Sequence, residues 1–126
     1  MKLIFLASRY SGFMAACWRR LGSLPNVQLT VFALDGMKAS MAEASSDPKF
    51  SAQVPEGFEL HLISPDEAMD WTKFRRHVVR LQADVVVMAG WVYRAYWDAL
   101  WQSDLRLARL IVMADTPIRH DLRQWF

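Results

Sequence analysis

Two residues near the end of the chain have the types and the spacing for acid–base chemistry. Asp115 follows the apolar segment 110–114, and Arg119 lies four residues further on. A carboxylate can act as a general base, and a guanidinium can bind an anionic group of a substrate. We therefore predict that Asp115 is catalytic and that Arg119 binds substrate. The alternative is that Asp115 caps a helix and forms a surface ion pair with Arg119.

Aromatic residues follow a second apolar segment. Gly90, Trp91 and Tyr93 come directly after residues 85–89. The flat face of an aromatic ring matches the apolar C–H patches of a sugar, so these residues are candidates for substrate binding. The interpretation that both rings simply extend the hydrophobic core has equal weight.

A third group of candidates, Arg9, Tyr10, Ser11 and Gly12, follows the apolar segment at the start of the chain. Gly12 frees backbone N–H groups at the start of a predicted helix, which is a weak signal for an anion site. The segment contains neither G-x-G-x-x-G nor G-x-x-x-x-G-K-[ST], so we expect neither a dinucleotide site nor a P-loop. An unusual nucleotide-binding domain is a weaker alternative.

All three groups follow predicted strands. Four apolar residues at 85–88 are typical of a strand buried on both faces. The sequence predicts five strands, at 2–7, 27–34, 57–63, 85–89 and 109–114, and helices at 13–22, 64–81 and 94–103. This alternation predicts an α/β fold: a doubly wound parallel five-stranded sheet, Rossmann-like, of order 3-2-1-4-5, with helices on both faces. The three groups would then meet at its carboxyl edge.

Helical spacing predicts which side chains face the sheet. In the first helix we expect Phe13, Cys17 and Leu21 to share the buried face, with Met14 and Trp18 beside it. This position makes Cys17 an inert core thiol rather than a nucleophile. The helix at 94–103 is expected to bury Trp97, Leu100 and Trp101. Ser64, Pro65 and Glu67 have the pattern of a capping box at the start of the helix 64–81.

Composition narrows the class of protein. Residues 1–126 form one predicted domain with 53% hydrophobic residues, 22% charged residues and a net charge of +2. The sequence has no basic stripe of the kind that predicts nucleic-acid binding. It also has no apolar stretch long enough to predict a transmembrane segment. A single cysteine is typical of a reducing compartment, so we expect a cytoplasmic protein. The three histidines (His61, His77 and His120) lack the spacing of metal ligands.

Two segments resemble a known enzyme family. Residues 83–91, followed by Tyr96 and by Ala99-Leu100, resemble the fourth strand and the next helix of GT-B glycosyltransferases, especially family 4. Residues 111–119 resemble that family's fifth strand and its Asp-bearing loop. The Ser11-Gly12 turn lies where the family has a glycine-rich acceptor loop, with one glycine here in place of a pair. The resemblance extends over nearly the whole chain.

The resemblance implies a function. The chain would be the N-terminal, acceptor-side domain of an enzyme that transfers a sugar from a nucleotide-sugar to a hydroxyl acceptor, without a bound metal. The loops at 9–12, 91–93 and 115–119 would hold a small-molecule or glycan acceptor. No cofactor is expected on this domain, because the nucleotide-sugar would bind a C-terminal donor-binding domain. The chain ends within a predicted helix, so we expect it to be part of a longer protein and inactive alone.

An alternative function and a second apparent motif also have to be considered. The six tryptophans could form a partner surface on a stand-alone flavodoxin-like binding or protein-interaction domain. Glu59 and Glu67 have the spacing of the paired-glutamate motif in the family's second domain. We interpret that match as chance, because the capping box already explains Glu67.

Overall fold

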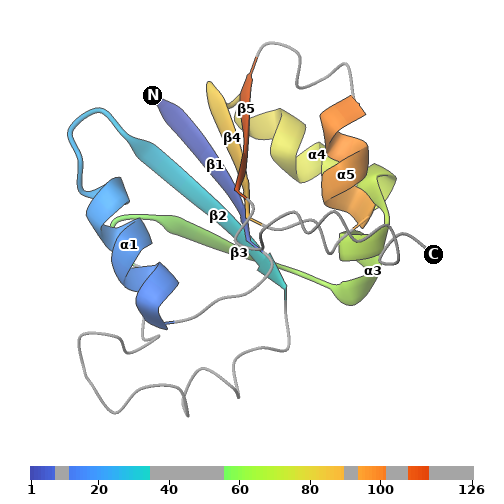
Figure 1. Cartoon of the computed structure of the whole chain (residues 1–126), viewed down its shortest axis with the longest axis horizontal. Coiled ribbons are helices and arrows are strands. Elements are labelled where there is room, and N and C mark those ends of the chain that lie inside the picture. The colour runs from blue at the N-terminus through green and yellow to red at the C-terminus, as the bar shows by residue number, and fades with distance from the viewer. Residues whose placement is uncertain (8–11, 35–55, 90–93, 102–107, 114–126) are drawn as a thin grey trace, which may run out of the picture.

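The sheet has the predicted architecture. The computed structural model describes residues 1–7, 12–34, 56–89, 94–101 and 108–113. All five strands are parallel, and their order is β3-β2-β1-β4-β5 (Figure 1). The elements in chain order are β1 (Lys2–Ala7), α1 (Gly12–Gly22), β2 (Gln28–Leu34), β3 (Glu59–Ile63), α3 (Pro65–Met69), α4 (Trp71–Leu81), β4 (Val85–Ala89), α5 (Arg94–Trp101) and β5 (Arg109–Met113). The predicted doubly wound α/β fold of order 3-2-1-4-5 is confirmed.

Helices cover both faces of this sheet. Figure 1 shows α1 on one side of the strands and α3, α4 and α5 grouped on the other. Successive side chains of β1 alternate between the two layers: Leu3 and Phe5 pack toward α1, while Ile4 and Leu6 pack toward α4 and α5. β1 and β4 are therefore central strands with apolar contacts on both sides, as the run at 85–88 predicts.

The prediction for the buried face of α1 is wrong for two of its three residues, whereas the third, Leu21, is partly buried against the core. Phe13 is 65% exposed and Cys17 is also exposed, whereas Ala15 and Trp18 are buried. The ring of Trp18 packs edge-on against Phe5 at 5.4 Å, and a second aromatic ring, Phe58, lies 5.8 Å away. The large indole occupies the space between sheet and helix, so the helix turns this stripe inward and Cys17 outward.

The predicted single helix over 64–81 is two helices. Asp70 has extended backbone angles (φ −136°, ψ 104°) and separates α3 from α4. Its carboxylate accepts a hydrogen bond of 2.9 Å from the backbone N–H of Thr72, which caps α4. Both helices bury apolar side chains at helical spacing against the sheet: Ala68, Trp71, Phe74 and Val78. The break at Asp70 therefore leaves both α3 and α4 packed against the sheet.

The prediction for α5 is also wrong in detail. Trp97 is 39% exposed and Trp101 is 80% exposed, while Ala95, Tyr96 and Ala99 are buried. The small alanines let the helix approach the sheet closely, and Tyr96 supplies the bulk of the contact. The side chain of Leu100 lies outside the described residues, as does the predicted helical turn beyond Trp101.

The two edge strands differ in character. β3 is an edge strand, as the predicted strand order requires. The glycine before it is held close to α1. Gly57 has φ +82°, and a Cβ on Gly22 would lie 1.8 Å from the Gly57 carbonyl oxygen. Neither position accepts a side chain without movement of the backbone. β5, at the other edge, is exposed along its whole length.

Candidate functional site

Three strands end side by side at the carboxyl edge of the sheet. The pairing places Ala7 at the end of β1 beside Ala89 at the end of β4, and Ala89 beside Met113 at the end of β5. The segments that begin at residues 8, 90 and 114 therefore leave the sheet from neighbouring points. In open α/β sheets ligands bind outside this edge, where the connections to the two sides of the sheet diverge. Here that point lies between β1 and β4.

Only one predicted site residue belongs to the described part of the chain. Gly12 is the first residue of α1, as expected for the turn into that helix. Because α1 leads from the carboxyl end of β1 to the amino end of β2, it starts at the same edge of the sheet. The other candidates lie outside the described residues: Arg9, Tyr10, Ser11, Gly90, Trp91, Tyr93, Asp115 and Arg119. Their roles stay predictions.

A buried hydroxyl holds the end of β1. The side chain of Tyr96 is fully buried, and its hydroxyl donates a hydrogen bond of 3.0 Å to the carbonyl oxygen of Ala7. The Tyr96 ring lies 6.0 Å from that of Phe74, so α5 is anchored to α4 as well as to β1. This bond holds the end of β1, after which the chain continues to the candidate residues 9–12. Sequence reasoning used Tyr96 only as part of the family resemblance and missed its position.

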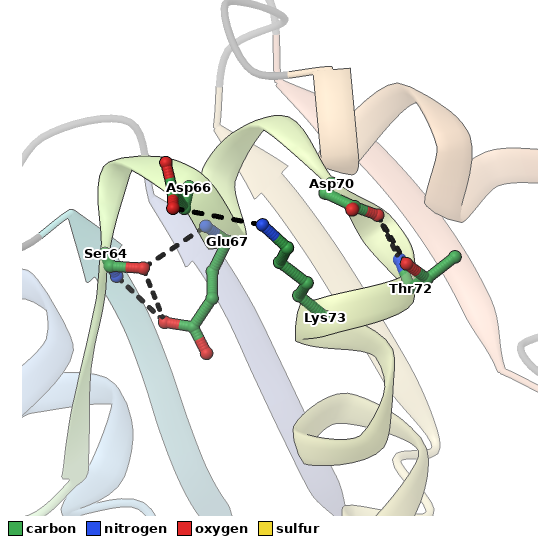
Figure 2. Close-up of polar contacts among 6 residues, drawn as sticks. All are labelled: Ser64, Asp66, Glu67, Asp70, Thr72 and Lys73. Carbon is green, nitrogen blue, oxygen red and sulfur yellow. Dashed lines mark hydrogen bonds and ion pairs between the residues drawn. The ribbon is translucent and has the colours of Figure 1, made fainter.

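The start of α3 lies at the same edge and is closed by a complete capping box (Figure 2). The backbone N–H of Ser64 donates to Oε2 of Glu67 at 2.9 Å, and the backbone N–H of Glu67 donates to Oγ of Ser64 at 3.2 Å. The Ser64 backbone N–H, which prefers the ionised carboxylate, is the main cause that lowers the pKa of Glu67 below 4.5. The nearby His77 ring nitrogen, 3.5 Å from Glu67 Oε1, acts in the same direction.

The apparent glutamate pair does not form one site. Glu59 is the first residue of β3, whereas Glu67 lies beyond the carboxyl end of that strand. Glu59 bonds instead to the ring of His61 at 2.8 Å, on the same face of the strand. Since five residues of strand extend over roughly 13 Å, the two carboxylates cannot act on one substrate atom. The structure agrees with the interpretation of the motif as a chance match.

Both histidines in the described ranges have structural partners. His61 stacks on Phe32 with ring centroids 5.0 Å apart, and His77 faces Glu67. Within the ranges that the structure describes, no three His, Cys, Asp or Glu side chains are placed to hold a metal ion. His120 lies outside those ranges.

The amino edge of the sheet is joined by Asp84, a residue that the sequence analysis did not single out. Its carboxylate accepts a hydrogen bond of 2.6 Å from the backbone N–H of Lys2, and its own N–H donates to the Lys2 carbonyl at 2.9 Å. Its carbonyl accepts from the N–H of Arg109 at 2.9 Å. Asp84 therefore sets the alignment of β1, β4 and β5 at one edge, which determines how their ends align at the other.

Comparisons with protein-family models, with curated proteins and with solved structures found no match to this chain. None of the helices that the structure describes is long and apolar enough to cross a membrane.

Proposed function

We propose that this chain is the acceptor-side N-terminal domain of a GT-B glycosyltransferase, which transfers a sugar from a nucleotide-sugar to a hydroxyl of a small-molecule or glycan acceptor. The observation that supports it most is the alignment of the ends of β1, β4 and β5 at one edge of the sheet. The segments after these ends carry the residues predicted to hold the acceptor. The resemblance of residues 83–91 and 111–119 to the family supports the same proposal.

The proposed roles follow from the chemistry of each group. Trp91 and Tyr93 stack on the apolar face of an acceptor ring, and Arg119 binds an anionic substituent. Asp115 takes the proton of the acceptor hydroxyl while the hydroxyl oxygen bonds to the anomeric carbon of the donor sugar. The bond between that carbon and the nucleoside diphosphate breaks, and the diphosphate leaves on a separate donor-binding domain. We further propose that the reaction uses no bound metal and takes place in the cytoplasm.

Ligand titration of the chain tests this proposal. The probes are a panel of mono- and disaccharides and, separately, a panel of nucleotide-sugars, with tryptophan fluorescence as the readout. We expect saccharides to change the fluorescence, nucleotide-sugars to leave it unchanged, and no sugar transfer to occur. The Trp91→Ala variant is expected to bind the saccharide about 10-fold more weakly, the equivalent of about 1.4 kcal/mol of lost stacking.

The matched control is Trp101→Ala, because Trp101 is 80% exposed on α5. We expect this variant to bind the saccharide as the wild type does. Binding of a nucleotide-sugar without any saccharide binding, or sugar transfer by the 126-residue chain, would contradict the proposal.

A second candidate function is a stand-alone flavodoxin-like domain that binds another protein. The observation in its favour is the exposure of Trp97 and Trp101, which lie four residues apart and so share one side of α5. Exposed tryptophans are frequent in protein interfaces. A chain that responds to no saccharide at millimolar concentration, with both tryptophans still exposed, would favour this candidate over the first.

A further inference from the structure

A small pocket lies at the amino edge of the sheet, opposite the edge that carries the candidate site. It has a volume of about 110 Å³, and its polar lining residues come from β1, β2 and α4: Lys2, Gln28, Thr30 and Arg80. A water molecule takes up about 30 Å³, so this space suits a few waters or one small polar group of a ligand. None of the four residues has a role in the proposed acceptor site.

The register of the sheet brings these groups together. Ile4 packs in the layer of α4 and α5, and it pairs with Thr30. Lys2, two residues before Ile4, pairs with Gln28. Because paired residues and alternate residues of a strand share a face, Lys2, Gln28 and Thr30 all lie on the α4 side of the sheet. Arg80 belongs to the last turn of α4 and lines the same pocket.

The fold does not use the polar groups of this pocket. Thr30 is buried, with 4% of its surface exposed, and its hydroxyl has no hydrogen-bond partner within the described ranges. In the same ranges neither Lys2 nor Arg80 forms an ion pair. A buried hydroxyl without a protein partner costs free energy unless water or a ligand accepts its hydrogen bond. The pocket therefore combines a buried donor with two cations that are available to an anion.

Two carboxylates lie beside the pocket, and each already has a partner. Glu59 pairs with Thr30 in the sheet, and its Oε1 lies 2.8 Å from the ring nitrogen of His61. Oδ2 of Asp84 accepts a hydrogen bond of 2.6 Å from the backbone N–H of Lys2. These carboxylates are held by a histidine ring and a backbone group, which leaves the side chains of the two cations for another acceptor.

We propose that this pocket binds a phosphate group, either as free phosphate or at the end of a phosphomonoester. The Arg80 guanidinium and the Lys2 ammonium neutralise its charge, while the Gln28 amide and the Thr30 hydroxyl donate to its oxygens. A phosphomonoester carries a charge of about −1.5 to −2 at neutral pH and presents three acceptor oxygens, which matches two cations and two neutral donors. A carboxylate presents two oxygens and a single charge, so it leaves donors of the pocket unused.

Titration of the isotope-labelled chain with inorganic phosphate at constant ionic strength tests the proposal, with amide chemical shifts as the readout. We expect saturable shifts at Lys2, Gln28 and Thr30, and none at Ala7 and Ala89 on the opposite edge. Glycerol 3-phosphate and acetate are titrated separately. Tighter binding of glycerol 3-phosphate than of inorganic phosphate identifies a phosphomonoester as the ligand, and the reverse order identifies free phosphate. Acetate is expected to bind about 10-fold more weakly than either, because it forms fewer charge-assisted hydrogen bonds.

Two variants separate the site from the net charge of the protein. Arg80→Gln is expected to weaken phosphate binding about 10-fold, because it removes a charge-assisted hydrogen bond. The matched control is Arg76→Gln, which removes the same charge from an exposed position four residues earlier in α4 and is expected to leave the affinity unchanged. Equal weakening in the two variants would show that phosphate responds only to net charge, and it would overturn the proposal.

Thr30→Val tests the buried hydroxyl, because valine has nearly the same shape and cannot donate. We expect it to weaken phosphate binding about 5-fold and to leave the free protein at least as stable as the wild type, since no protein partner is lost. Lower stability with unchanged phosphate affinity would mean that the hydroxyl is structural, and would contradict its role as a donor to phosphate. Absence of saturable shifts with millimolar phosphate, or equal affinity for acetate and both phosphates, overturns the proposal as a whole.

Discussion

Single polar side chains fix the ends of the elements around the candidate site. Glu67 and Ser64 exchange hydrogen bonds that satisfy the first N–H groups of α3, and Asp70 does the same for α4. Tyr96 satisfies a backbone carbonyl at the end of β1. None of these residues has a predicted role in chemistry. The caps determine where α3 and α4 begin, and the Tyr96 bond holds the end of β1, after which the first group of candidate residues follows.

The capping box makes stability depend on pH. The folded-state pKa of Glu67 lies below 4.5. The contribution of Glu67 to the free energy of unfolding is therefore present above pH 4.5 and is lost as the pH falls through the lowered pKa. We expect the free energy of unfolding to decrease below about pH 5. The decrease due to Glu67 is expected to be no more than about 1 kcal/mol, because its side chain is partly exposed and solvent screens its interactions. Urea denaturation of wild type and of Glu67→Gln over this pH range measures it.

The Gln side chain keeps an oxygen that can accept from the Ser64 backbone N–H but does not titrate. The variant is therefore expected to lose less stability on acidification than the wild type. An equal loss in the two proteins would show that Glu67 does not carry the effect.

Removal of the Tyr96 hydroxyl tests the anchor of β1. Tyr96→Phe keeps the buried ring and leaves the Ala7 carbonyl without its phenol donor, so we expect a loss of about 1–2 kcal/mol in the free energy of unfolding. Amide hydrogen exchange is expected to accelerate at the end of β1 and not in β3. Unchanged stability and exchange would contradict the proposed role of this bond.

At the scale of elements, the packing of α1 and α5 depends on which side of each helix faces the sheet. Both helices carry more apolar residues than one face can bury, and in both the sequence alone suggests more than one buried face. In α1 the buried stripe contains Ala15 and Trp18, and in α5 it contains Ala95, Tyr96 and Ala99. In each case small residues allow close approach and one large ring fills the remaining space.

Two tryptophans of opposite burial test these assignments. Trp18→Ala is expected to cost about 3–5 kcal/mol in the free energy of unfolding, because a ring that is 1% exposed leaves a cavity against Phe5 and Phe58. Trp101→Ala is expected to change it by less than about 0.5 kcal/mol, since the ring is 80% exposed. Chemical denaturation of both variants measures the difference. Equal costs would mean that the buried faces are assigned wrongly.

These helices also show where sequence reasoning about this fold succeeds and where it stops. The run at 85–88 and the Ser64 capping box depend on local hydrophobicity and local hydrogen bonding, so each is evident from neighbouring residues. The exposure of Cys17 and Trp97 depends on the exact space between helix and sheet, which residues far along the chain determine. The break at Asp70 reflects competition between a side-chain cap and the continuation of a helix.

At the scale of the whole molecule, the order of the strands determines what meets at the carboxyl edge. β1 lies between β2 and β4, so the first segment after β1 and the segment after β4 leave the sheet as neighbours. This convergence could be predicted from the sequence, because long crossovers and apolar strands suffice to predict a doubly wound sheet. The sequence could not predict the anchor at Tyr96, because the partner of its hydroxyl is 89 residues away.

The proposed acceptor site is tested most directly by amide chemical-shift mapping of the isotope-labelled chain with the mono- and disaccharide panel. We expect a binding saccharide to shift the amides of Ala7, Ala89 and Met113 at the carboxyl edge, and to leave those of Lys2, Val85 and Arg109 at the amino edge unchanged. Shifts confined to the amino edge, or a carboxyl edge that responds to nucleotide-sugars and to no saccharide, would contradict the account.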